Sequence, residues 1–194
     1  MKPSVRKITV TAIMSAIAAV LMFLEFSVPL MPSFIKFDFS ELPALIVSFA
    51  LGPWWGVAVC FLKNFIKLVI QTNTGGIGEL ANFLLGAAFV LPAGYLYKFR
   101  KSRPMALLGS VAGALTSALV SLPINYYVTY PIYSKFMPIE AIVGMYQEIW
   151  SGVDGLFACL VTFNMPFTFL KCIVVSAITF LIYKRLSPIL KGVK

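Results

Sequence analysis

The sequence GLFACLVTFNMPFTFLKCIVVSAITFLIY, residues 155–183, contains a single charged side chain, Lys171. An apolar stretch of this length predicts a transmembrane helix, which needs about 20 residues. Lys171 follows Asn164 by seven residues and Thr168 by three, and these spacings place all three on one face of a helix. Because an ionisable group inside a membrane span is expensive, we expect this face to line a cavity and to serve the function.

The composition of the whole chain is that of a membrane protein. Of its 194 residues, 60% are hydrophobic and only 12% are charged, which is more apolar than a typical soluble domain. The first apolar run, residues 8–26, is too long for the core of a signal peptide and lacks a clear small-residue cleavage site. We therefore expect it to remain as a transmembrane helix.

Apolar runs separated by proline and glycine predict an all-α integral membrane protein, with six transmembrane helices in one domain over residues 1–194. The second run is short for a span, so it must extend back through Phe39, tilt, or begin below the membrane surface. The expected spans are residues 8–30, 39–51, 54–70, 79–97, 105–127 and 155–183.

The basic residues orient these helices. With six spans and a cytoplasmic N-terminus, most of the 16 lysines and arginines fall on one side of the membrane, as the positive-inside rule requires. Both termini are therefore predicted to be cytoplasmic. The basic residues form short clusters beside the spans, which favours contact with the lipid bilayer and not with nucleic acid. The clusters consist of Lys2, Arg6, Lys7, Lys98, Arg100, Lys101, Arg103, Lys184, Arg185, Lys191 and Lys194.

Residue types that carry catalysis are scarce. The sequence has no histidine, which excludes histidine acid–base chemistry, histidine metal ligands and conventional catalytic triads. Its three cysteines form no C-x-x-C pair, and no Walker A motif occurs. We therefore expect no enzyme activity, no cofactor and no metal site, and any energy from ATP has to come through a partner.

Polar residues near the predicted outer ends of the helices indicate a binding site. Glu79 and Asn82 open the fourth run, where Glu79 either caps the helix or contacts a ligand, and Asn125 closes the fifth run. Lys63 and Lys67 lie inside the third run. They need neutralisation, which we expect from an outer carboxylate, with direct contact to the substrate as the alternative. The carboxylates considered for this pairing are Asp38, Glu41 and Glu79.

The first run carries Ala12 and Ala16 in a small-xxx-small pattern near its predicted cytoplasmic end. Such a pair lets another helix approach closely. The spacing alone leaves open whether that helix belongs to this chain or to another subunit.

Several strings in order along the chain resemble the riboflavin-specific substrate-binding subunits of energy-coupling factor transporters. The more specific strings are KFDFSELPAL at 36–45 and GELANF at 78–83. Shorter ones are LGP at 51–53, LKN at 62–64, LPAG at 91–94 and PFTFLK at 166–171.

This resemblance implies a six-helix protein in the plasma membrane of a prokaryote that captures riboflavin from outside and has no enzyme activity. Riboflavin is then the transported ligand and not a cofactor. The pocket is expected between the outer halves of helices four to six, under the first outer loop. The partners implied are a membrane coupling subunit, on which Ala12 and Ala16 dock, and two ATPase subunits.

The resemblance also suggests the binding residues. Lys171 matches a lysine expected to donate hydrogen bonds to the ligand, whereas Thr168 stands where the family is expected to have asparagine. Because a threonine hydroxyl cannot offer the paired donor and acceptor of an amide, Asn164 is the expected substitute. The full set of expected ligand-binding residues is Asp38, Glu79, Asn82, Asn125, Asn164, Thr168 and Lys171.

Other functions stay open on the residues alone. The same architecture serves a binding subunit for another vitamin, such as thiamine or biotin. A membrane-embedded enzyme acting on lipid and an independent ion-coupled carrier are further alternatives.

Overall fold

The computed structural model describes residues 5–72 and 74–191, the last eight of these as backbone only. Lys2 and Lys194 of the predicted basic clusters lie outside the described residues. The six longest helices are α1 (Val5–Phe23), α2 (Glu41–Leu51), α3 (Pro53–Ile70), α4 (Ile77–Phe99), α5 (Arg103–Ile124) and α9 (Met165–Lys191). Shorter elements are the strands β1 (Phe26–Ser27) and β2 (Lys36–Phe37), the helices α6 (Tyr130–Tyr133), α7 (Ile139–Gln147) and α8 (Gly155–Cys159), and the π-helical turns η1 (Asn125–Thr129) and η2 (Leu160–Asn164).

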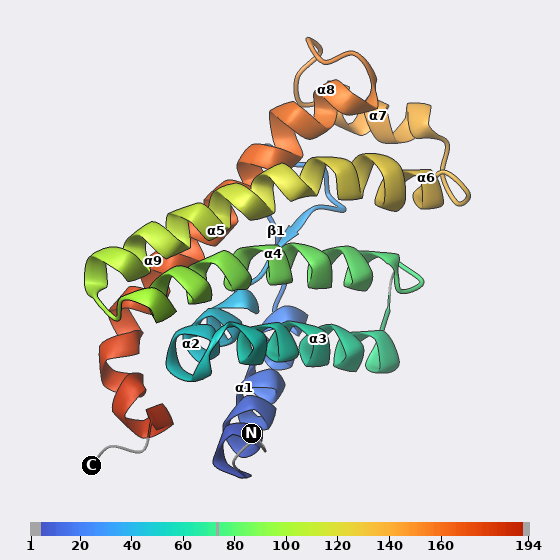
Figure 1. Cartoon of the computed structure of the whole chain (residues 1–194). Helices are drawn as coiled ribbons and strands as arrows, with labels where there is room; N and C mark the ends of the chain where they lie inside the picture. Colours follow the sequence, from blue (N-terminus) through green and yellow to red (C-terminus); the bar gives the residue numbers. More distant parts are fainter. Residues whose placement is uncertain (1–4, 73, 192–194) are drawn as a thin grey trace.

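The long helices form a bundle with α4 near its centre. α4 packs between α3 and α5, α9 packs against α5 and α2, and α1 packs against α3 and α2. The α4–α5 connection and the α3–α4 connection lie at opposite ends of the bundle, and α6, α7 and α8 gather at the end that holds the α3–α4 connection (Figure 1). The basic residues near 100 and the expected ligand site are thus at opposite ends, as the charge pattern predicts.

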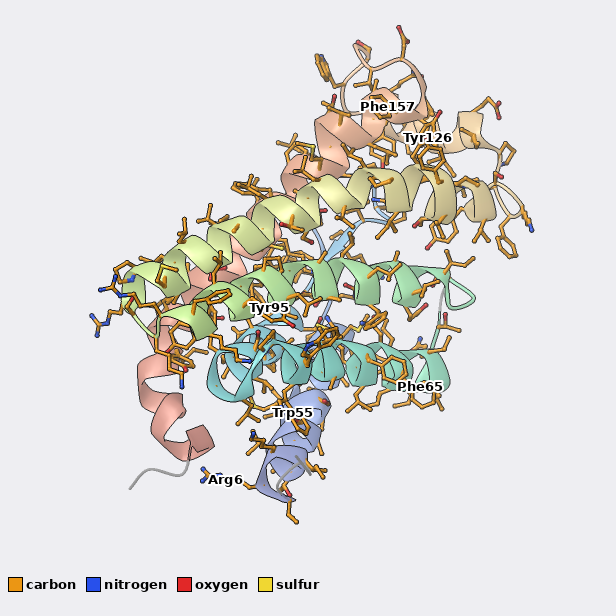
Figure 2. All side chains as sticks on the ribbon, in the orientation of Figure 1. Arg6, Trp55, Phe65, Tyr95, Tyr126 and Phe157 are labelled. Carbon is orange, nitrogen blue, oxygen red and sulfur yellow. The ribbon has the colours of Figure 1, made fainter. Side chains whose placement is uncertain are left out.

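Five helical segments among the described residues are long and apolar enough to cross a membrane. The 11-residue helix α2 is shorter than a membrane span, so the count of six remains a prediction. Large apolar side chains point outward from the bundle, as lipid-facing residues do, and Figure 2 shows Tyr126 and Phe157 together near α8, with ring centroids 5.8 Å apart. The segments are Val5–Phe23, Pro53–Ile70, Ile77–Phe99, Arg103–Tyr133 and Gly155–Tyr183.

The helix boundaries differ from expectation at two places. α1 ends at Phe23, whereas the first span was expected to continue to residue 30. The residues that follow form a two-stranded antiparallel hairpin, in which Phe26 pairs with Phe37. The region 128–154, which lies between the fifth and sixth expected spans, contains α6 and α7.

The two π-helical turns have the same local cause. Pro131 and Pro166 each follow the first residue of their turn by six positions, which places the carbonyl four residues before each proline inside the turn. In a regular α-helix that carbonyl clashes with the proline ring and loses its N–H partner. Widening to a π-turn relieves the clash, and such turns are frequent at functional sites. Asn125 begins one turn and Asn164 ends the other.

Small residues let α4, α5 and α2 approach closely. A Cβ atom added at Gly113 of α5 would lie 2.2 Å from the carbonyl oxygen of Phe89 on α4. Nearby, Ser117 Oγ donates to the Leu85 carbonyl at 3.0 Å and Ser48 Oγ donates to the Val90 carbonyl at 2.9 Å. Close approach with interhelical hydrogen bonds is the usual way that membrane helices associate.

The alanine pair of α1 faces away from the bundle. Ala12 and Ala16 are exposed, whereas Ser15 and Ala19 are buried. Within the described part of the chain the pair is therefore not buried by another helix, and the close-approach face that it forms is available to a helix of another subunit.

Gly113→Ala should lower the free energy of unfolding by about 1–3 kcal/mol, because the new methyl group meets rigid backbone. Gly144→Ala in α7 is the matched control, since no atom lies within 4 Å of its added Cβ. There the alanine should raise the free energy of unfolding by about 0.5–1 kcal/mol, because it lowers the backbone entropy of the unfolded chain. Thermal unfolding in detergent measures both, and an unchanged Gly113 variant would contradict the close packing of α4 on α5.

Candidate ligand-binding site

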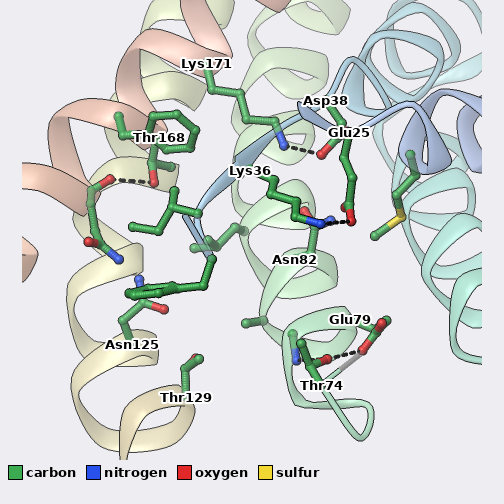
Figure 3. A pocket seen from close by; sticks show the side chains of 18 of the residues that line it. Glu25, Lys36, Asp38, Thr74, Glu79, Asn82, Asn125, Thr129, Thr168 and Lys171 are labelled. Atoms are coloured by element: carbon green, nitrogen blue, oxygen red, sulfur yellow. Dashed lines mark hydrogen bonds and ion pairs between the residues drawn. The ribbon is translucent and has the colours of Figure 1, made fainter. Parts of the chain in front are cut away.

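A cavity of about 380 Å³ lies at the end of the bundle that holds the α3–α4 connection. Its walls come from the end of α1, the 24–38 segment, α3, the α3–α4 connection, α4, η1, α6, η2 and α9. Figure 3 shows side chains that face it. The structure brings all seven predicted residues to this one cavity, and Lys171, Thr168 and Asn164 share one face as their spacing predicts. The seven are Asp38, Glu79, Asn82, Asn125, Asn164, Thr168 and Lys171.

Lys171 has two carboxylate partners. Its Nζ donates to Asp38 Oδ2 at 2.8 Å and lies 3.2 Å from Glu41 Oε2. The ammonium has three donors, so one N–H remains beside the cavity. The sequence had not indicated Glu41 as a partner of Lys171.

Lys63 completes a buried cluster of four charges. Its fully buried Nζ lies 2.7 Å from Glu41 Oε1 and also contacts the Ser40 hydroxyl. Two ammoniums and two carboxylates therefore alternate through Lys63, Glu41, Lys171 and Asp38. Burial alone would raise the pKa of Asp38, but the positive charges of Lys171 and Lys63 hold that pKa well below its ordinary value.

A second cluster ties the end of α1 to α3 and to the hairpin. Glu25 accepts from Lys67 at 2.5 Å and from Lys36 at 3.1 Å. Burial opposes ionisation of Glu25, but both lysines outweigh it and lower its pKa. Lys63 and Lys67 are each neutralised by a carboxylate, as expected: Lys63 pairs with Glu41, one of the three carboxylates named in advance. Lys67 pairs with Glu25, which was not among those three, because the early end of α1 turns this carboxylate toward α3.

Glu79 supports the α3–α4 connection while it lines the cavity. Its Oε2 accepts from Thr74 Oγ1 at 2.7 Å (Figure 3). The same oxygen accepts from Thr72 Oγ1 at 3.1 Å. The carboxylate is buried at 4% exposure. Oε2 of Glu79 therefore holds the α3–α4 connection in place, and its other carboxylate oxygen remains available to a ligand in the cavity.

The amides differ in how firmly they are held. Asn82 and Asn125 make no side-chain hydrogen bond within the described part of the chain, so their donors and acceptors are available to a ligand. Asn164 is bound on both sides, since its Oδ1 accepts from Tyr146 at 2.7 Å and its Nδ2 donates to Tyr130 at 3.2 Å. Thr168 donates its hydroxyl to the Asn164 carbonyl at 2.8 Å, which leaves it only acceptor capacity.

Sequence reasoning missed Glu25, Glu41, Tyr130 and Tyr146 as parts of the site. For the two tyrosines, the available signal was the proline that follows each π-turn, which marks an irregular point in the helical segment. Among residues 5–72 and 74–191, no three histidine, cysteine or acidic side chains gather in a way that could hold a metal.

The comparisons with known proteins agree with this geometry. The family model of the ECF transporter substrate-specific component matches residues 6–183. The chain belongs to this family. The resemblance read from the KFDFSELPAL and GELANF strings is thereby confirmed, and the alternatives of a lipid enzyme and of an independent carrier are set aside, because the family is one component of a transporter.

Named relatives cover nearly the whole chain. It is 32% identical over 193 residues to "Riboflavin transporter RibU" of Staphylococcus aureus (strain TCH60), a match spanning 100% of this chain and 96% of the relative. It is also 32% identical to "Riboflavin transporter FmnP" of Bacillus subtilis (strain 168), over 95% of this chain and 93% of the relative. A solved structure described as the S component of a bacterial ECF transporter superimposes with a TM-score of 0.74 at 32% identity, covering 95% of this chain and 97% of the other.

Lys63→Met should lower the free energy of unfolding of this S component by about 3–5 kcal/mol, because it leaves a buried carboxylate with too little positive charge. Lys36→Met is the matched control, since the Lys36 side chain is 40% exposed and exposed pairs contribute about 0–1 kcal/mol. Chemical or thermal unfolding in detergent compares the two. Equal effects would contradict the buried four-charge cluster.

Acid should weaken the tie between the hairpin segment and α9. The pKa of Asp38 is lower in the folded state than in the unfolded chain, so its stabilisation is complete above about pH 4 and is lost as the pH falls through the lowered value. The unfolding temperature should therefore drop on acidification, and less so in Asp38→Asn. A variant that follows the same pH profile as the parent would show that Asp38 is not the group responsible.

Proposed function

We propose that this S component binds riboflavin in the cavity and serves its uptake as the substrate-specific subunit of an ATP-driven transporter. The observation that carries the proposal is the match at 32% identity, over nearly the full length, to two proteins named riboflavin transporters. The cavity supports it, because the residues expected to meet a flavin all line one space. A volume of about 380 Å³ lies in the range of small-molecule pockets, about 300–1,000 Å³.

The cavity offers the groups that a flavin requires. The spare N–H of Lys171 and the free amides of Asn82 and Asn125 provide donors and acceptors for the polar edge of the ring system. Phe34 and Phe167 supply flat apolar surfaces. The carboxylate of Glu79 suits the hydroxyls of the ribityl chain. A ligand that lacks these polar groups leaves buried donors unpaired, which supplies selectivity.

The proposal extends to topology and partners. We place six spans in the cell membrane of a prokaryote, with α2 as the short second span and both termini cytoplasmic. The exposed alanine pair of α1, Ala12 and Ala16, then meets a membrane coupling subunit, and two ATPase subunits complete the transporter. The exposure of both alanines supports this docking face.

Titration of the purified chain with riboflavin, followed by tryptophan fluorescence, tests the proposal. Lys171→Ala and Asn125→Ala should each weaken binding, Lys171→Ala by about tenfold or more because a charge-assisted hydrogen bond is lost. Lys135→Ala, at a residue outside the cavity lining, should leave the affinity unchanged.

Two results would overturn the proposal. Tighter binding of thiamine or biotin than of riboflavin would assign the chain to another vitamin. Unchanged riboflavin affinity in both Lys171→Ala and Asn125→Ala would remove the ligand from this cavity.

A further inference from the structure

Three side chains at one wall of the cavity form a closed ring of hydrogen bonds, and two of them, Asn164 and Tyr130, line the cavity. Asn164 Nδ2 donates to the Tyr130 oxygen at 3.2 Å, the Tyr130 and Tyr146 hydroxyls are 2.5 Å apart, and Tyr146 donates to Asn164 Oδ1 at 2.7 Å. Since Tyr146 uses its one proton on Asn164, the proton between the tyrosines belongs to Tyr130. The ring therefore runs in one direction, from Asn164 through Tyr130 and Tyr146 back to Asn164.

The ring sets which way the Asn164 amide faces. The distance of 2.7 Å to Tyr146 suits an O–H donor on a carbonyl oxygen, and 3.2 Å to Tyr130 suits an amide N–H donor. After both bonds are made, Asn164 keeps one N–H for the cavity that it lines. Hydrogen bonds that share groups in this way reinforce one another.

Tyr146 belongs to the support and not to the cavity wall. It is completely buried and lies in α7, a helix that the sequence did not predict. Its ring packs edge-on against Phe34, with 5.8 Å between the centroids, and in a tilted arrangement against Phe163, with 5.3 Å between the centroids. Burial raises the pKa of Tyr146, so its hydroxyl keeps the proton that Asn164 needs.

We infer that Tyr146 is a positioning residue for ligand selection, holding the Asn164 amide so that it presents an N–H donor to a carbonyl of the bound flavin. This inference rests on the proposed function, in which Asn164 contacts the ligand. Without the Tyr146 hydroxyl the amide can rotate, and its donor no longer faces the ligand in every molecule.

A double-mutant cycle on the full chain tests the inference, with riboflavin affinity and unfolding temperature measured for each variant. Tyr146→Phe should weaken binding about three- to tenfold, as expected for one hydrogen bond. In an Asn164→Ala background the same change should have no further effect on affinity, because the amide that it positions is gone. Tyr126→Phe, which removes a hydroxyl outside the ring, should bind as the parent does.

The outcomes separate the two proposals. Unchanged affinity in Asn164→Ala would remove Asn164 from the ligand site and so defeat the proposed function at this residue. Weakened binding in Asn164→Ala with parental binding in Tyr146→Phe would overturn the positioning role alone. The positioning role would also be overturned if the fold-losses of riboflavin affinity from the two single substitutions multiplied in the double variant. A tyrosine with a merely structural role acts independently of the amide.

If Tyr146→Phe does not fold, Tyr130→Phe provides the same test, because it opens the ring at its other hydroxyl. Its loss of affinity should likewise vanish in the Asn164→Ala background. Multiplying losses in that cycle would overturn the inference.

Discussion

Two lysines, Lys63 and Lys171, lie in the interior of the bundle, where a lone ammonium is unstable, and Asp38 and Glu41 neutralise them there. The four charged groups come from α2, α3, α9 and the segment before α2. Removing any one of them leaves a buried charge without its partner, which is far more destabilising than losing an exposed pair. The mutual positions of these elements are therefore fixed by electrostatics as much as by apolar packing.

The same cluster determines what the cavity can offer a ligand. Asp38 and Glu41 occupy two of the three donors of Lys171, so the lysine acts as a positioned hydrogen-bond donor and not as a free positive charge. Asp38 lies just after the hairpin, and Glu25 ties the other end of the same segment to α3. The segment that covers the cavity is thus held at both ends by ion pairs, one buried and one half-buried.

Helical periodicity and the positions of charged residues in apolar segments made several features of the site predictable from the sequence. The shared face of Asn164, Thr168 and Lys171 follows from helical spacing, and the need to neutralise Lys63 follows from its apolar surroundings. The ion pair between Lys67 and Glu25 could not be predicted in the same way. It depends on where α1 stops, and the apolar run continues past Phe23 without a strong breaker until Pro29. The hairpin that ends the helix is stabilised by contacts with distant segments, which local propensity does not contain.

The two prolines explain why the sequence predicted the asparagines of the site but not the side chains that orient them. Pro131 follows the fifth predicted span and Pro166 lies inside the sixth, yet a proline in a helix can produce a kink, an end or a π-turn. Here each produces a π-turn. The ring of Tyr130, Tyr146 and Asn164 links the residue that follows η1 to the last residue of η2, both directly and through Tyr146 of α7. The irregularity that proline imposes on one helix is here stabilised in part by side chains from another. The sequence therefore shows which amides are polar and buried, whereas their orientation arises only when both turns and α7 have come together.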